Sequence, residues 1–135
     1  MDRILIVSDS AQSREQLAGL FTQGPRPSVA TAASGGDARR ALLGAEYDLV
    51  LINTPLRDEF GHELAAQAAQ RGAGVLMLVR AGLEEEVATR VEDWGVLVLP
   101  RPLNRTAFYK SVKLLQAARR RVWHLLEENR RLRRA

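Results

Sequence analysis

The stretch YDLVLINTPLRDEFG, residues 47–61, decides the fold of this chain. Four consecutive apolar residues, 49–52, run directly into the polar Asn53. A strand without polar alternation is apolar on both faces, as a strand in a parallel sheet covered by helices must be. We therefore expect a buried central strand that ends at Asn53. Open α/β sheets place their active sites at the carboxyl ends of strands, so Asn53 marks a candidate site.

Strand and helix patterns alternate along the rest of the chain. Further strands are expected at residues 3–7, 28–32, 75–79 and 96–99. Between them lie helical patterns, for which Ser10, Ser34 and Asn104 are expected as amino-terminal caps. The helix after the central strand is expected at about 61–71, and the next has an apolar face that ends at Trp94. This alternation predicts an α/β fold with a doubly wound, five-stranded parallel sheet.

Composition and charge set limits on the class of protein. The chain has 135 residues, 46% of them apolar, and no cysteine, which fits one domain with an appendage and an expected cytoplasmic location. We expect no cofactor, no metal and no membrane span. Residues 1–100 carry 9 basic and 14 acidic side chains, whereas residues 101–135 carry 11 basic and 2 acidic ones. The basic excess therefore belongs to the tail.

The tail predicts one long helix, because no glycine or proline occurs from Asn104 to Ala135. Its first part, with Phe108, Val112 and Leu115, should pack on the sheet, and a heptad repeat begins at Leu115. The a positions are Leu115, Val122 and Asn129, and the d positions are Ala118, Leu125 and Leu132. This spacing predicts the start of a parallel coiled coil and a homodimer, with Asn129 setting the register and Glu128 facing the partner's Arg133. We place the domain boundary between 1–115 and 116–135.

The arginines of this helix leave two interpretations open. They form a solvated helix face, or they contact the phosphates of a nucleic acid. Few aromatic side chains accompany them to stack on bases, and no groove-reading motif is visible.

The opening stretch resembles the receiver domain of two-component response regulators. In that family the central strand ends in a phosphate-accepting aspartate, and a glycine follows eight residues later, as Gly61 follows Asn53 here. The resemblance covers about residues 1–115 and implies the strand order 2-1-3-4-5. It also implies five site positions, which fall here on Ser8, Asp9, Asn53, Val79 and Arg101. The peptide bond before Pro102 is commonly cis in receivers.

These five residues are unsuited to phosphoryl transfer. The family's acid pair becomes Ser8 and Asp9, its nucleophile Asn53, its hydroxyl Val79 and its lysine Arg101. An amide is a poor nucleophile, and Mg²⁺ prefers carboxylate ligands, of which only Asp9 is left. We expect a receiver without phosphorylation and without enzymatic activity, in which Arg101 pairs with Asp9. The alternative is an atypical receiver that is still phosphorylated.

Three other residues near the strand end have simpler interpretations. Asp58 and Glu59 in the loop after Asn53 are expected to be charges near a helix amino terminus, the alternative being a role as substitute phosphate acceptors. His62 is expected to be a surface residue in the first turn of the next helix.

The segments GAGVLMLV, residues 72–79, and VEDWGVLVLPRPLNRTAFYKSVKLL, residues 91–115, resemble the ANTAR-type transcription antiterminators. Members of that family join a receiver-like domain with a degenerate phosphosite to a coiled coil and a small RNA-binding domain. That last domain is absent from these residues. RNA contact is therefore expected only through the missing domain or weakly through the basic helix, and control is expected from a regulatory protein or ligand.

Overall fold

A five-stranded parallel sheet forms the centre of the protein. The computed structural model describes residues 2–21 and 27–134, without the side chains of 133 and 134. The strand order is β2-β1-β3-β4-β5, as expected. The central strand ends at Asn53 as predicted, and β5 runs to Arg101 instead of ending at residue 99. The strands are β1 (Arg3–Val7), β2 (Ser28–Ala32), β3 (Leu49–Asn53), β4 (Gly74–Arg80) and β5 (Leu97–Arg101).

Five helices alternate with the strands. Each predicted cap is formed: Ser10 Oγ, Ser34 Oγ and Asn104 Oδ1 accept N–H groups at 3.0–3.2 Å. The fourth helix is shorter than expected, because Trp94 lies in a separate 3₁₀ turn that ends at Gly95 with φ 71°. The helices are α1 (Ala11–Gly19), α2 (Gly35–Gly44), α3 (His62–Gln70), α4 (Glu84–Val91), the 3₁₀ helix η1 (Glu92–Trp94) and α5 (Arg105–Arg134).

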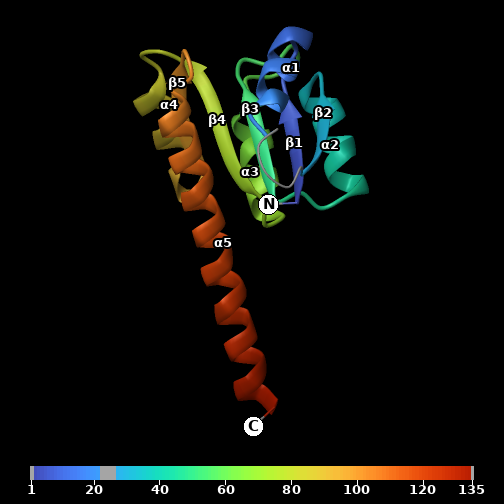
Figure 1. Ribbon diagram of the computed structural model, residues 1–135, viewed down its shortest axis with the longest axis vertical. Coiled ribbons are helices and arrows are strands. Elements are labelled where there is room, and N and C mark those ends of the chain that lie inside the picture. The colour runs from blue at the N-terminus through green and yellow to red at the C-terminus, as the bar shows by residue number, and fades with distance from the viewer. Residues whose placement is uncertain (1, 22–26, 135) are drawn as a thin grey trace.

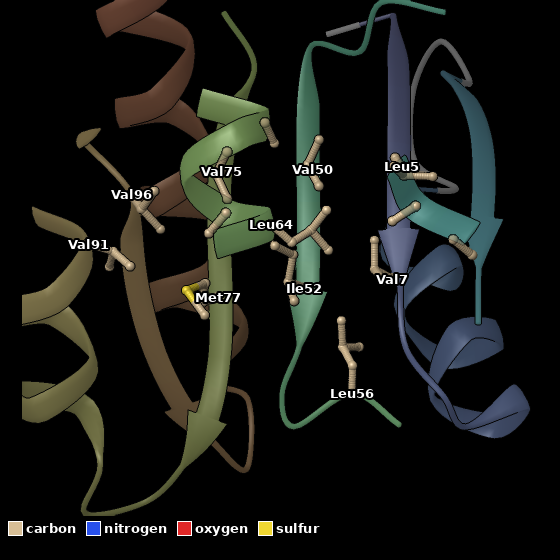
Figure 2. Packing of buried hydrophobic residues seen from close by; sticks show 14 of the residues in the cluster. Leu5, Val7, Val50, Ile52, Leu56, Leu64, Val75, Met77, Val91 and Val96 are labelled. Carbon is tan, nitrogen blue, oxygen red and sulfur yellow. The ribbon is translucent and has the colours of Figure 1, made fainter. Parts of the chain in front are cut away.

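Alternate residues of each strand pack into two core layers, which explains why the strands lack polar alternation. One layer joins the sheet to α2, α3 and α4. Figure 2 shows part of this layer, in which Ile52 of β3 lies beside its register partner Met77 of β4. The opposite layer joins the sheet to α1 and α5, with Phe108 fully buried.

The long helix α5 extends well past the sheet. Its 30 residues span about 45 Å at 1.5 Å per residue. In Figure 1 it starts beside the carboxyl end of β5 and continues beyond the amino ends of the strands. We call residues 119–134 the overhang. Within the described part of the chain, no helix is both long enough and apolar enough to cross a membrane.

Candidate functional site

The predicted site residues gather at the carboxyl edge of the sheet. Asn53 is the last residue of β3 and is half-buried, and Arg101 is the last residue of β5. Ser8 follows β1 directly and is fully buried, with its N–H bonded to the carbonyl of Ala32 at 3.0 Å. The next residue, Asp9, is exposed to solvent. The parallel topology therefore brings the ends of three strands together around Asn53.

A chain of hydrogen bonds runs across this edge from Arg101 to Ser8. Arg101 Nη1 donates to Asn53 Oδ1 at 2.9 Å, and the Asn53 amide nitrogen donates to Ser8 Oγ at 3.3 Å. The same Nη1 donates to the carbonyl oxygens of Thr54 and Leu78. One guanidinium nitrogen thus connects β5 to β3 and β4.

The predicted pairing of Arg101 with Asp9 is wrong. Among the described residues, the partners of Arg101 Nη1 are the three oxygens of Asn53, Thr54 and Leu78, and no ion pair joins it to Asp9. The oxygens at the ends of β3 and β4 meet the guanidinium as it crosses the sheet edge, so the side chain does not extend to the loop after β1.

The oxygen atoms at this edge are not suited to bind Mg²⁺, the ion that the chemistry of receivers requires. Asp9 is the sole carboxylate of the five site positions. Asn53 Oδ1 already accepts from a guanidinium, whose positive charge would oppose a divalent cation at the same place. In the part of the chain that the structure describes, no group of three or more His, Asp or Glu side chains is arranged to hold a metal.

Val79, the position to which the resemblance assigns a hydroxyl, carries no reactive group. Val79 is fully buried in the core layer beneath α4, where it packs with Val87 and Val91. A hydroxyl does lie nearby, on Thr54, but this residue is buried and its Oγ1 donates to the carbonyl of Leu78 at 2.8 Å. That hydroxyl therefore serves to join β3 to β4.

Two cis peptide bonds lie at this edge. The Arg101–Pro102 bond is cis, as the family resemblance implies. The Thr54–Pro55 bond is also cis, which the sequence analysis did not foresee.

The loop after β3 is attached to α2. The Asp58 carboxylate accepts the N–H groups of Gly35 and Gly36 at 2.9 and 3.0 Å, and these bonds hold its pKa below the usual value. Glu59 forms an ion pair with Arg39. As expected, the acids lie near a helix amino terminus, and their contacts in the structure are with the first turns of α2.

His62 is less exposed than predicted. Its ring stacks on Phe60 with centroids 4.5 Å apart, and its Nε2 is buried without a hydrogen-bond partner among the described residues. Burial lowers the pKa of His62, and the positive charge of Arg90 on α4 lowers it further. His62 is therefore part of the contact between α3 and α4.

The predicted dimerisation residues separate into two groups. Leu115 is buried against β4, where a Cβ on Gly74 would come within 3.1 Å of the Leu115 Cβ, so it is not available to a coiled-coil seam. Leu115 therefore packs on the sheet as expected, and this burial removes it from the predicted heptad, in which it was also the first a position. The other five are exposed to solvent: Ala118, Val122, Leu125, Asn129 and Leu132. The predicted boundary at residue 115 falls inside one continuous helix.

An ion pair that the sequence analysis missed fixes α5 at the opposite edge of the sheet. Arg119 Nη1 lies 2.7 Å from Asp48 Oδ1, just before the start of β3. The other Asp48 oxygen accepts the N–H groups of Asp2 and Arg3, both at 2.9 Å. The four-residue spacing from Leu115 to Arg119 was the available signal, because it places both side chains on one helix face.

Comparison with known proteins gives the class of the fold. No protein-family model matches the sequence, and no curated protein matches it. Among solved structures, a response regulator receiver domain protein from Clostridium thermocellum has a TM-score of 0.78 at 13% identity, covering 90% of this chain and 99% of that one. A signal receiver domain of an HD domain-containing protein from Pseudomonas fluorescens Pf-5 has a TM-score of 0.78 at 16% identity, covering 91% and 92%.

A third structure agrees with these two. A two-component response regulator from Clostridium difficile has a TM-score of 0.75 at 20% identity, covering 87% of this chain and 97% of that one. The chain therefore has the fold of the receiver domains of response regulators. At these identities the likeness concerns the fold, and the function has to be argued from the residues of the site.

Proposed function

We propose that this chain is a receiver that accepts no phosphoryl group and acts as the regulatory and dimerisation module of a signal-transduction regulator. The observation that carries the proposal is the 2.9 Å hydrogen bond from Arg101 Nη1 to Asn53 Oδ1. A neutral amide, held by a guanidinium, stands where an acyl phosphate would have to form. The site has neither the nucleophile nor the carboxylates that would hold Mg²⁺.

Contacts with a regulatory protein or ligand then replace phosphorylation as the means of control. The carboxyl edge of the sheet is held by its own side chains, so the start of α5 does not depend on a phosphoryl group for its position. Any signal has to act on an exposed surface of the domain or of α5.

The kind of regulator we propose is the ANTAR-type transcription antiterminator. Support comes from the sequence segments 47–61, 72–79 and 91–115 and from the long α5 that follows the receiver fold. In such a regulator α5 would connect the receiver to an RNA-binding domain. The protein itself would then supply pairing and control, with no catalysis of its own.

We propose that the overhang mediates dimerisation, because its apolar side chains are exposed to solvent in a single copy of the chain. Val122, Trp123, Leu125, Leu126 and Leu132 are between 51% and 73% exposed. So many large apolar side chains on one solvent-facing helix indicate a protein interface.

Sedimentation velocity across a concentration series, with and without acetyl phosphate and Mg²⁺, tests this function. We expect a dimer whose dissociation constant is unchanged by the phosphodonor and is raised by Leu125→Asp. The matched control is Leu43→Asp, since Leu43 is 75% exposed on α2, away from the overhang. A monomer at high micromolar concentration, or dimerisation that depends on the phosphodonor, would contradict the proposal.

A further inference from the structure

A groove lies under the amino ends of the strands, where α5 leaves the domain. We call it the base groove. One wall is the loop between α3 and β4 together with the 3₁₀ turn η1, and the other wall is α5. The lining includes Ala73, Trp94, Leu115, Val122, Trp123 and Leu126. The apolar part of this lining continues along the overhang, and the charged residues Asp2, Asp48, Arg119 and Arg120 also line the groove.

The predicted heptad, which begins at Leu115, cannot form a parallel coiled coil over its full length. Leu115 packs on β4, so a parallel seam begins only at Ala118. Five positions remain, and two of them are the small Ala118 and the polar Asn129. Two heptads with such a seam are short for a stable two-stranded coil. A parallel pair also leaves the base groove uncovered.

We infer that a second copy of this chain packs its overhang antiparallel to the first and places its Leu132 in the base groove. This inference rests on the proposed dimerisation and specifies its geometry. In this register Ala118 lies opposite the partner's Asn129, and Val122 lies opposite the partner's Leu125. The partner's Leu132 then reaches the level of Leu115, where the base groove opens.

The register uses the whole apolar face of the overhang. Around the helix, Val122 lies between Leu125 on one side and Leu126 on the other. An antiparallel partner seated over Val122 covers both neighbours along its length. Its last turn then contacts Trp94, which is 47% exposed in one copy.

Charge favours the same arrangement. Residues 1–100 are net acidic and residues 101–135 are strongly basic. An antiparallel partner brings its Arg130 and Arg131 to the base of the domain, near Glu92 and Asp93, which precede Trp94 in η1. A parallel partner instead sets these arginines beside their own copies, at a helix spacing of about 10 Å that is close to the screening length in physiological salt.

Disulfide trapping distinguishes the two orientations, because the chain has no cysteine of its own. Ala118→Cys and Asn129→Cys are introduced into separate proteins, which carry tags of different mass. The two proteins are mixed and oxidised with oxidised glutathione. In the antiparallel register residue 118 meets the partner's 129. The two copies of residue 118 are then about 16 Å apart along the axis at 1.5 Å per residue. A disulfide requires Cα atoms within about 7 Å.

A mixed 118–129 disulfide without either homodisulfide is the expected result. Homodisulfides 118–118 and 129–129 would establish a parallel dimer, which overturns this inference and leaves the proposed dimerisation intact. A dimer in sedimentation that gives no trapped product also overturns the inference. A monomer at high micromolar concentration overturns both.

A charge reversal tests the base groove without altering the overhang. Asp93→Arg is expected to weaken the dimer by about tenfold, mainly through slower association, because Asp93 is exposed and would lie at the rim of the interface. Glu15→Arg, the same change at an exposed position of α1, should leave the dissociation constant unchanged. Equal dissociation constants for Asp93→Arg and the unsubstituted protein would show that the base groove is not part of the interface.

Discussion

The Arg101 guanidinium lies 2.9 Å from the Asn53 amide oxygen and thereby joins the carboxyl ends of β5 and β3. In a receiver that works by phosphorylation, these two positions have to respond to an added phosphoryl group. Here they are already bonded to each other and, through Asn53, to Ser8. Under the proposed function, this contact gives Asn53 a structural role.

Substitution of Arg101 should lower the stability of the domain. Arg101→Ala leaves the carbonyl of the buried Thr54 without this donor and frees the amide of Asn53. We expect the free energy of unfolding to fall by about 1–3 kcal/mol, as measured by urea denaturation. Arg101→Lys should recover part of the loss, because it keeps a positively charged donor. The recovery should be incomplete, because an ammonium group does not reproduce the donor geometry of a guanidinium. Unchanged stability in Arg101→Ala would show that the contact is incidental.

The close approach of α5 to β4 predicts a steric effect at Gly74. A Cβ at this position would lie 3.1 Å from the Leu115 Cβ and 3.4 Å from the carbonyl oxygen of Asp48. Gly74→Val should therefore displace α5 and cost about 1–3 kcal/mol of stability in denaturant titrations. Gly44→Ala is the control, since nothing lies within 4 Å of its added Cβ. Equal stability of the two variants would contradict the packing.

The ion pair between Asp48 and Arg119 predicts a pH dependence on the acid side. Burial opposes ionisation of Asp48, but hydrogen bonds from the Arg3 N–H, Arg119 and the Asp2 N–H outweigh it and hold its pKa below the usual 3.8. Its contribution to stability is therefore present above pH 3.8 and is lost as the pH falls through the folded-state pKa. Asp48→Asn should be less stable than the unsubstituted protein at pH 7, and the difference should shrink towards pH 3.

Arg119→Met measures how much the ion pair alone contributes to the stability of the domain. The pair is partly exposed, with side-chain exposures of 37% and 31%, so its loss should cost less than about 1 kcal/mol. The backbone N–H bonds to Asp48 remain in this variant. A pH dependence as weak as that of Asp48→Asn would mean that Arg119 alone sets the pKa of Asp48.

His62 predicts a second pH dependence, nearer neutrality. Burial and then the charge of Arg90 lower its pKa, while Glu86 acts in the opposite direction. The unfolded chain takes up a proton at the ordinary imidazole pKa of about 6.5, and the folded chain does so only at lower pH. The free energy of unfolding should thus fall as the pH drops below about 6.5.

Replacement of the imidazole tests this assignment. His62→Phe keeps a ring against Phe60 and should flatten the stability profile between pH 7 and pH 5. His124→Gln changes an exposed position of the overhang, and the free energy of unfolding of this variant should still fall as the pH drops. A profile that is the same in all three proteins would show that another group titrates in this range.

The sheet was predictable because uninterrupted apolar strands and helix caps are local signals. Residues 49–52 and Ser34 needed no knowledge of distant contacts. The partners of charged side chains were not predictable. Arg101 was expected to meet Asp9, but it meets oxygens at the ends of β3 and β4, whose positions follow from strand register. Leu115 was expected both to pack on the sheet and to begin the heptad, and it does pack on the sheet. Sequence spacing alone does not say which of the two contacts an apolar side chain makes.

Intact mass spectrometry after incubation with acetyl phosphate and Mg²⁺ tests the central claim most directly. The account predicts no added phosphoryl group, because Asn53 cannot form an acyl phosphate and Arg101 holds its amide. A stoichiometric phosphoryl adduct that maps to the loop after β1 or to the end of β3 would contradict it.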